Sequence, residues 1–329
     1  MLAAGNAERR PGAALILRHH TSLALLIIAS LPGGTQRSGA ETKNSDIFFR
    51  SPSAMAEPIG LIAGQGLLPV LEARGMRAAG RSVGCVALGG QVHPDLRAEC
   101  DRFANSGIIR LGRWIRLLRR WGTREAVLVG RVNKARIYEP LRLLRQMPDL
   151  RAARVWFRAL RHDKRSHALL GAVADELHWA GIELIDSTRY ISEHLAHRGV
   201  LTTADPTDDQ AAAIEYALPI VRRLAELDIG QSIAVTPRQV LAVEAIEGTD
   251  AMIDRAGDVC DSDSWVLVKV AKKSHDMRFD VPSVGPDTIE RMKAGRAACL
   301  AIEADRTIIL DKQQTLADAD RAGIVVVGI

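Results

Sequence analysis

The chain has 329 residues, of which 47% are hydrophobic and 25% are charged. This length suggests about two domains and excludes a single small domain, and the composition excludes a disordered or collagen-like chain. The net charge of +5 hides an asymmetry: residues 110–170 hold 17 Lys and Arg against 4 Asp and Glu (+13), whereas residues 201–329 hold 14 against 22 (−8). The basic segment suits a surface that faces phosphates or a solvated charged face, and the acidic segment suits a cation.

The four cysteines, Cys85, Cys100, Cys260 and Cys299, lie far apart and form no C-x-x-C pair. Their spacing predicts neither a zinc knuckle nor a dithiol redox site. Reduced, inert thiols in the cytoplasm are therefore the expected state.

The first 56 residues differ from the rest of the chain in composition. Three arginines precede the apolar run at 23–31, a pattern that a secretory signal or a short anchor would also show. The run is too short to cross a bilayer, which takes about 20 apolar residues. Residues 32–53 are rich in Gly, Ser, Thr and charges without period. We therefore expect residues 1–56 to be a disordered extension or the product of a start assigned too early.

Apolar runs and helical periodicity alternate in residues 57–190. The expected strands lie at 59–63, 81–88, 126–130 and 182–185, and the expected helices lie at 67–79, between the second and third strands, and at 141–179. Strands that alternate with helices indicate a parallel sheet that is covered on both faces. The fold class expected here is α/β, with an N-terminal Rossmann-like parallel-sheet domain.

A polar, turn-rich stretch at 191–207 is expected to link this domain to a second one at 208–329. The expected elements there are a helix from Asp208 or Asp209 to Glu226, a hairpin of 232–235 with 240–245, and strands at 265–270, 297–303, 307–310 and 324–329. The C-terminal domain is therefore expected to be mixed α/β with some antiparallel pairing.

A basic amphipathic helix is expected near the middle of the chain. Leu111, Trp114, Ile115, Leu118 and Trp121 recur at helical spacing, with arginines between them. Trp and Arg at an apolar edge suit the headgroup zone of an anionic membrane. Packing against a sheet explains the same period and is the favoured interpretation.

The glycine turn at Gly64-Gln65-Gly66 lies between an expected strand and helix. Amides at such a turn and the helix dipole favour an anion, so the turn is a candidate phosphate cradle. A tight turn without a ligand explains it equally well. A dinucleotide fingerprint would need a small residue in place of Pro69 and a ribose-binding carboxylate about 20 residues further on, where 86–90 offers none.

A second polar cluster follows the expected hairpin. It contains Glu244, Glu247, Gly248, Thr249 and Asp250. Thr249 is expected to cap a helix, and Gly248 lets backbone approach a ligand closely. Glu244 and Glu247 need not face the same side, because side chains alternate along a strand. A simple capping motif is the alternative, although one cap does not need several carboxylates.

A third cluster occupies 269–286, where Lys269, Lys272 and Arg278 share a loop with Asp280. Cations can neutralise phosphoryl oxygens, while a carboxylate holds a divalent metal or orients water, and phosphoryl transfer needs both roles. Prolines at positions 282 and 286 would stiffen the loop. A solvated charged loop is the alternative.

Taken in order, these segments resemble the LpxI type of UDP-2,3-diacylglucosamine pyrophosphatase, a family of lipid A precursor synthesis. The similarity extends over 58–329, and it is carried by 60–69, 228–231, 240–252, 278–286, 309–311 and 326–328. It implies two domains around a cleft that holds a diacylated sugar phosphate, with dependence on a divalent cation such as Mg²⁺. The implied reaction is hydrolysis of the pyrophosphate to UMP and 2,3-diacylglucosamine 1-phosphate.

The resemblance also implies site residues. The family's essential aspartate falls on Asp280, which is expected to hold the metal or orient the water. Asp250 and Glu247 are expected as further metal ligands, and Lys272 and Arg278 are expected to offset developing charge. The substrate-binding residues expected are Gly64, Gln65, Gly66, Leu68, Gln231, Gly248, Thr249 and Lys269.

The chain departs from the family pattern at four places. Gln65 stands where a third glycine is usual, Lys273 replaces a proline, His275 replaces a glutamine, and 162–164 replaces a G-D-D stretch. These changes bear on the nucleotide pocket, and they leave the segment from Glu247 to Asp250 intact.

The expected partner is an amphiphilic sugar-nucleotide substrate, and no nucleic acid is expected. Peripheral contact with the inner membrane and a homodimer are left open. Two rival functions also remain at this point. A nicotinamide-dependent oxidoreductase rests on the glycine turn alone, and a basic nucleic-acid-binding module rests on the +13 segment.

Overall fold

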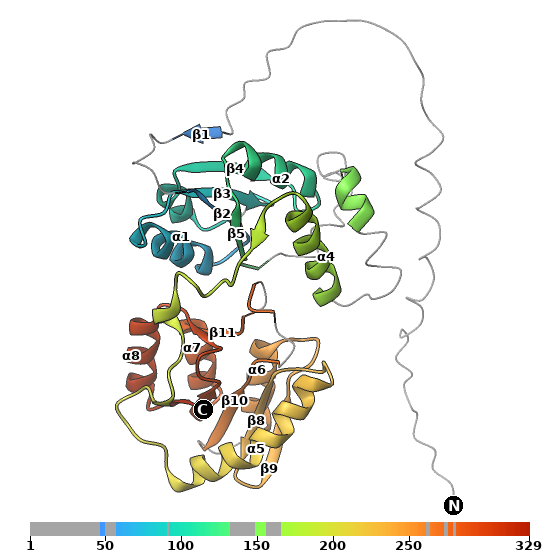
Figure 1. Cartoon of the computed structure of the whole chain (residues 1–329). Helices are drawn as coiled ribbons and strands as arrows, with labels where there is room; N and C mark the ends of the chain where they lie inside the picture. Colours follow the sequence, from blue (N-terminus) through green and yellow to red (C-terminus); the bar gives the residue numbers. More distant parts are fainter. Residues whose placement is uncertain are drawn as a thin grey trace, which may run out of the picture. The chain divides into compact units, whose positions relative to one another are not determined.

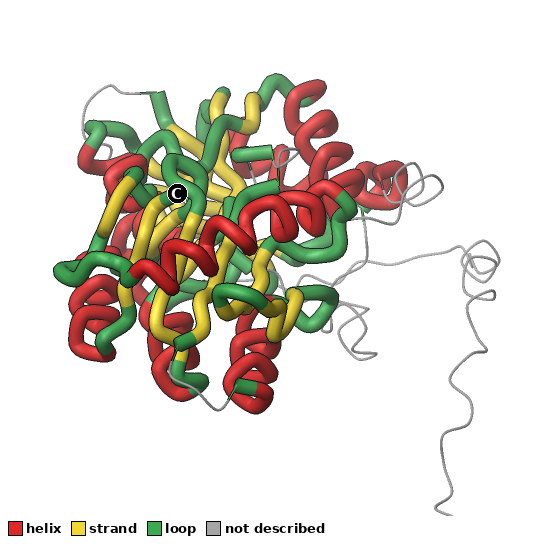
Figure 2. Tube along the Cα trace, turned by 90° about the horizontal axis from the view of Figure 1, so that it is seen from below, coloured by secondary structure: helices red, strands yellow, loops and turns green. Residues whose placement is uncertain are grey.

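A computed structural model of the chain describes residues 47–49, 57–90, 92–131, 149–155, 166–260, 264–272, 276–278 and 281–329. All of them fall in one of the two units into which the chain divides, residues 45–329. Strands and helices alternate along this unit, and the strands of each sheet lie between helices (Figure 2). The expected α/β class is confirmed.

The first sheet has six strands in the order β1-β4-β3-β2-β5-β6, and all neighbours are parallel except β1 and β4. Its strands are β1 (Ile47–Phe49), β2 (Ile59–Ala63), β3 (Val83–Leu88), β4 (Arg102–Ser106), β5 (Glu125–Val129) and β6 (Glu183–Leu184). Every residue of β2 and β3 is buried. Parallel strands covered on both faces read as unbroken apolar runs, which explains why the sequence predicts these two well.

Helices cover both faces of this sheet (Figure 1). They are α1 (Leu68–Ala78), α2 (Leu111–Arg120) and α4 (Ser166–Trp179), with a 3₁₀ turn at Pro94–Glu99. The apolar side of α2 is buried, with Trp114 and Trp121 in the same core cluster as Leu177 of α4. The core-packing interpretation of α2 is therefore confirmed, and its apolar side is not available to a membrane.

Two features of this half differ from the sequence-based expectation. Strand β4 lies where only a helix was expected, because its two apolar residues, Phe103 and Ala104, are adjacent and flanked by polar residues, which gives neither an apolar run nor an alternating pattern. Residues 47–49, within the expected disordered extension, pair with β4 as strand β1. The apolar run at 23–31 and most of the expected helix between 141 and 165 lie outside the described residues.

The second sheet also has six strands, in the order β7-β14-β12-β10-β8-β9. Its strands are β7 (Gly199–Val200), β8 (Ser232–Thr236), β9 (Gln239–Val243), β10 (Trp265–Lys269), β12 (Ala297–Ile302) and β14 (Val325–Gly328). Strands β10, β12 and β14 are parallel, and the β8–β9 hairpin and β7 are antiparallel to their neighbours. The expected mixture of parallel and antiparallel pairing is confirmed.

Helix α5 (Asp208–Glu226) packs on one face of the second sheet (Figure 1). The other face is covered by α6 (Thr249–Val259), α7 (Pro286–Ala294) and α8 (Lys312–Ala322). A short parallel pair, β11 (Ser283–Val284) and β13 (Ile308–Ile309), lies apart from both sheets. These layers leave the carboxyl ends of β10, β12 and β14 at one edge of the sheet.

Helix α5 begins one residue earlier than expected. Its cap is Thr207, whose hydroxyl accepts a hydrogen bond from the Gln210 amide, while the Gln210 side chain accepts one from the Thr207 amide. The expectation that Asp208 or Asp209 forms the cap is therefore wrong. Both acids instead lie in the first turn, where they favour the helix dipole.

The segment between the two sheets is anchored by backbone hydrogen bonds. The amide and hydroxyl of Ser187 both donate to the carbonyl of Met277, and the Ala196 amide donates to the carbonyl of Thr307. Within the range expected to be a linker, Gly199 and Val200 form strand β7. In the part of the chain described here, no helix combines the length and the apolar character needed to span a membrane.

Candidate active site

A buried lysine marks the carboxyl end of the central strand of the second sheet. Lys269 is the last residue of β10 and pairs in register with Ser232, the first residue of β8, and with Ile302, the last residue of β12. Only 6% of Lys269 is exposed. A lysine is rarely buried to this extent without a partner, and the carboxyl ends of parallel strands are where open α/β sheets bind ligands.

A chain of hydrogen bonds holds this lysine. The Lys269 ammonium donates to Thr249 Oγ1 over 3.1 Å, and the Thr249 hydroxyl donates to Glu244 Oε1 over 3.0 Å. Glu244 is 8% exposed, and its other oxygen accepts from the Gln231 amide over 3.3 Å. The carboxylate thus fixes the hydroxyl, and the hydroxyl fixes the ammonium.

The hairpin of β8 and β9 explains why these groups meet. The Glu244 amide donates to the carbonyl of Ser232, so the residue after β9 stays beside the start of β8. The Ser232 hydroxyl lies 3.4 Å from Thr249 Oγ1. Residues far apart in the sequence therefore share one edge because β8 pairs with both β9 and β10.

Burial lowers the pKa of the Lys269 ammonium. The carboxylates of Glu244 and Asp250 raise it, and the positive charge of Arg131 adds to the lowering. An ammonium has three N–H donors, and among the described residues this one donates only to Thr249. An anion placed against the remaining donors would stabilise the charged form of the lysine.

The amino end of α6 adds to this positive character. Its cap is Gly248, with φ of 85°, and no side chain caps the helix. The expectation that Thr249 is the cap is therefore wrong: Thr249 is the first helical residue, and its hydroxyl bonds to Glu244 instead. Uncapped amides at a helix start carry partial positive charge and bind phosphate groups well.

An acceptor with no partner completes the cluster. Gln231 Oε1 is buried, and no hydrogen-bond donor reaches it from the described residues. A buried carbonyl oxygen without a donor costs about 1–3 kcal/mol. A ligand hydroxyl or amide N–H would satisfy it.

The other expected site residues do not join this cluster. Glu247 is exposed and forms an ion pair with Arg255 over 2.8 Å. Asp250 has a side chain that is 50% exposed, and its nearest cation is Arg291 at 3.9 Å. Asp280 lies outside the described residues.

The two expected cations of the neighbouring loop are paired with carboxylates. Lys272 forms an ion pair with Asp228. Arg278 donates through Nε to Asp276 over 2.8 Å, and this hydrogen bond raises the pKa of the guanidinium.

The carboxylates that the structure describes do not fit a metal centre. No group of three His, Cys, Asp or Glu side chains that could hold a metal ion occurs among these residues. Glu247 and Asp250 each face an arginine instead of one another.

The glycine turn after β2 is closed by backbone. The Gly64 amide donates to the carbonyl of Val129, and Gln65 exchanges two hydrogen bonds with Arg131. A Cβ atom on Gly64 would lie 2.6 Å from the carbonyl oxygen of Arg131, so only glycine fits there. The amides of Gly64 and Gln65 are therefore already occupied, whereas Gly66 and Leu68 follow this contact.

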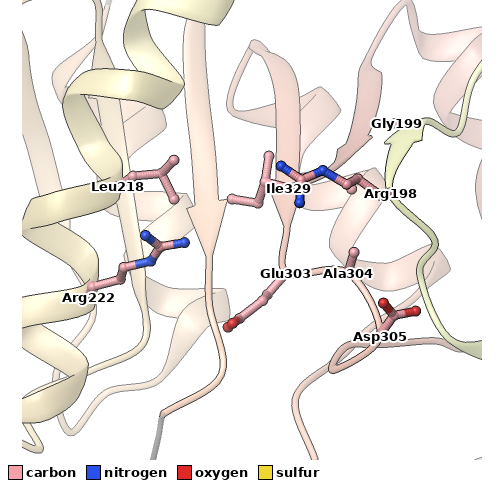
Figure 3. Close-up of a pocket in the computed structure, with 9 residues that line it drawn as sticks. Arg198, Gly199, Leu218, Arg222, Glu303, Ala304, Asp305 and Ile329 are labelled. Atoms are coloured by element: carbon pink, nitrogen blue, oxygen red, sulfur yellow. The ribbon is translucent and has the colours of Figure 1, made fainter.

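A separate cavity of about 520 Å³ lies at the ends of β12 and β14. Leu218 and Arg222 enter it from α5, and Figure 3 shows Arg198 and the carboxylates of Glu303 and Asp305 around the same space. Glu303 also accepts a hydrogen bond from the Ala271 amide over 2.6 Å. The mixture of two arginines and two carboxylates defines no single ligand class.

Sequence reasoning missed Glu244 as a site residue, although the cluster contained it. The signal was available: Glu244 directly follows the apolar run of β9, where a buried carboxylate needs a partner. This signal was not decisive, because the pattern of a strand does not show which residue of another element lies next to Glu244.

Fold and site together define an α/β protein with a buried lysine beside an uncapped helix start at the carboxyl end of a sheet. Residues 58–194 match the LpxI N-terminal domain and residues 197–327 match the LpxI C-terminal domain. The chain is also 33% identical over 283 residues to the UDP-2,3-diacylglucosamine pyrophosphatase LpxI of Caulobacter vibrioides, which covers 82% of this chain and 97% of the relative. The chain belongs to the LpxI family.

Proposed function

We propose that this chain hydrolyses the pyrophosphate of UDP-2,3-diacylglucosamine to UMP and 2,3-diacylglucosamine 1-phosphate, a step of lipid A synthesis. The observation that carries the proposal is the similarity to the Caulobacter enzyme along almost its whole length. In the reaction, the oxygen of one water forms a bond to phosphorus, one P–O bond of the anhydride breaks, and the water releases a proton.

Lys269 is the proposed electrostatic centre of this reaction. Phosphoryl transfer is catalysed mainly by positioning and by stabilisation of charge on phosphate oxygens. The unused N–H donors of Lys269 and the uncapped amides at Thr249 and Asp250 would bind such an oxygen. Glu244 acts through Thr249 as a positioning residue, and Gln231 would accept a hydrogen bond from the substrate.

Asp280 is proposed to orient the attacking water. It follows Arg278, which Asp276 holds in place. Dependence on Mg²⁺ stays a proposal, and because the described carboxylates form no metal centre we derive no step through a metal ion. Glu247, Asp250 and Lys272 are proposed only as outer groups, since each already faces an opposite charge.

The finer architecture is likewise proposed. We place a Rossmann-like domain at 57–190, a linker at 191–207 and a second domain at 208–329, with the substrate in a cleft between them. The bonds from Ser187 to Met277 support this placement, since they bring the loop after β10 to the segment after β6. Gly66 and Leu68 are proposed to contact the nucleotide.

Setting and partners follow from the substrate. A cytoplasmic location is proposed because all four cysteines are unpaired and buried. The acyl chains of the substrate suggest peripheral contact with the inner membrane, and a homodimer is left as a further proposal. The oxidoreductase alternative loses its basis, because the glycine turn uses two of its amides in the fold.

The decisive experiment follows UMP release from UDP-2,3-diacylglucosamine by the purified full chain. Wild type should release UMP, and no release would overturn the function. Asp280→Ala should lower the rate by at least about a hundredfold, whereas Asp258→Ala, an exposed aspartate on α6, should not. Undiminished turnover of Asp280→Ala would contradict only the catalytic role proposed for Asp280. Full activity in EDTA would contradict the proposed dependence on a divalent cation.

A further inference from the structure

One surface of the first half carries positive charge that the proposed active site does not use. Helix α2 contains no acidic residue, and it presents arginines on the side opposite its buried apolar residues. Arg110, the residue before the helix, adds a fifth positive charge, and we call the set the arginine face: Arg110, Arg113, Arg116, Arg119 and Arg120. Their helical spacing places them along a strip about 15 Å long.

The part of the chain that the structure describes places no carboxylate against the charge on this strip. None of the five forms an ion pair with a carboxylate of the described residues; Arg113 and Arg116 donate only to backbone carbonyls. The nearby Asp149 is occupied differently, because its carboxylate accepts from the amides of Gly112, Arg113 and Ala152. The strip therefore suits an anionic partner.

An exposed apolar side chain stands beside the arginine face. Asp149 ties the start of α2 to the helical segment 150–155, and Leu150 at the start of that segment is 91% exposed. A large apolar side chain next to unpaired arginines is typical of proteins that rest on lipid headgroups, where the apolar group enters the acyl boundary.

A nucleic acid fits this surface less well. Proteins that bind single strands combine a basic groove with exposed aromatic rings, and both tryptophans of this helix, Trp114 and Trp121, are buried. Entry into a duplex major groove needs a helix that projects, whereas α2 is packed against the first sheet along its length.

We propose that the arginine face of α2, with Leu150, is a docking surface for an anionic phospholipid bilayer. Arginines bind the headgroup phosphates and Leu150 enters the interface. The inference rests on the proposed function only in the choice of membrane as the setting of an amphiphilic substrate. Vesicle binding is measured without substrate, so failure of the docking surface and failure of the hydrolase are distinguishable.

The test is sedimentation of the full chain with vesicles of equal parts phosphatidylglycerol and phosphatidylcholine, against pure phosphatidylcholine. We expect binding only to the anionic vesicles, with affinity that falls as salt rises. Loss of one arginine contact should weaken binding about fivefold, so the double charge reversal Arg116→Glu/Arg119→Glu should weaken it by at least about 25-fold.

A matched control changes net charge equally at another place. Arg223→Glu/Arg238→Glu alters an arginine of α5 and one in the β8–β9 turn, both exposed, and should leave vesicle binding nearly unchanged. Leu150→Ser should weaken binding severalfold, whereas Leu227→Ser, another exposed leucine, should not. Equal losses in the two charge variants would show that only net charge matters and would overturn the proposal.

Two further results would also overturn it. One is binding of wild type to neutral and anionic vesicles alike. The other is absence of vesicle binding together with salt-sensitive binding to duplex DNA that Arg116→Glu/Arg119→Glu abolishes. UMP release by the same variants from detergent-dispersed substrate should match wild type, since none of these residues belongs to the proposed site.

Discussion

Two turns of this molecule follow the carboxyl ends of parallel strands, and they differ in the hydrogen-bonding capacity that remains. After β2, the amides of Gly64 and Gln65 donate to carbonyls next to β5. After β10, the Lys269 ammonium donates only to Thr249 among the described residues, and it lies beside an uncapped helix start. The first turn has the more familiar glycine pattern, whereas the second has the N–H donors that could bind a ligand. A binding site is therefore better identified by unsatisfied polar groups than by a motif.

The buried ionisable groups near the two turns, Glu72 and Lys269, differ in their hydrogen-bond partners. Glu72 on α1, after the glycine turn, is completely buried, and neither carboxyl oxygen has a hydrogen-bond partner among the described residues. Burial, with Asp186 and Glu193 nearby, raises its pKa to about 9, so it is a neutral acid at neutral pH. Lys269 instead has polar partners that hold it in position.

Removing the ammonium from the second turn should have the largest effect. We expect Lys269→Met to lower kcat by about 10²–10³, because one preorganised donor to a phosphate oxygen is lost in a site that excludes water. The measurement is UMP release, with thermal unfolding to verify the fold. Lys293→Met, at an exposed position on α7, is the control. Wild-type turnover by Lys269→Met would show that the turn after β10 contributes no more to catalysis than the turn after β2.

A titration of stability tests the neutral acid beside the first turn. The folded chain keeps the Glu72 proton up to about pH 9, whereas the unfolded chain releases it near 4.5. The stability that Glu72 contributes is therefore fully present below 4.5 and is lost as pH rises toward 9. Glu72→Gln should match wild type in acid and exceed it in free energy of unfolding by on the order of 3 kcal/mol near neutral pH.

Urea unfolding across this pH range measures the Glu72 effect. Glu215→Gln, at an exposed position on α5, should show no such divergence. Parallel pH curves for Glu72→Gln and wild type would mean that Glu72 is ionised in the folded chain.

A methyl group added at the first turn should lower the stability of the fold without lowering the turnover of the folded protein. Gly64→Ala places a Cβ atom against the Arg131 carbonyl, so we expect a loss of about 1–3 kcal/mol in the free energy of unfolding. Gly171→Ala, in α4 with open space around it, should be neutral or stabilising. A loss of turnover in folded Gly64→Ala that exceeds the loss in Lys269→Met would reverse the assignment of the two turns.

The smallest expected effect is on the pH profile. Glu244 raises the pKa of Lys269, so Glu244→Gln should lower that pKa further. Activity that needs the charged lysine falls as pH rises through its pKa, and in the variant this fall should begin at lower pH, with roughly tenfold lower activity for each unit of pKa lost. Glu247→Gln should leave the profile unchanged, because Glu247 is exposed and paired with Arg255.

Local pattern predicted much of the fold. Strands β2 and β3 are apolar throughout, and β10 is apolar up to its last residue, because parallel strands are covered on both faces; α5 is evident from its period. Strand β4 was missed because three of its five residues are polar, and pairing with its neighbours makes it a strand. The cap of α5 was placed one residue late because several cap-forming residues adjoin there.

The candidate site was predicted in part. Gly248, Thr249, Lys269 and Gln231 were all named, and the structure brings Lys269, Thr249 and Gln231 together through Glu244. Glu247 was expected beside them and lies at an exposed ion pair instead. A carboxylate-rich turn cannot show by its spacing which acid turns inward.

The sequence by itself determined the α/β class, the family and the segments in which chemistry is concentrated, because these depend on local periodicity and on motifs that are read along the chain. Only the tertiary structure decided that Glu244 supports the lysine, that the glycine turn is closed by β5, and that no carboxylate of the described residues pairs with the arginines of α2. Those outcomes depend on which side chains and backbone groups from distant elements meet. Whether a donor or acceptor is satisfied within the fold is determined by these contacts between distant elements.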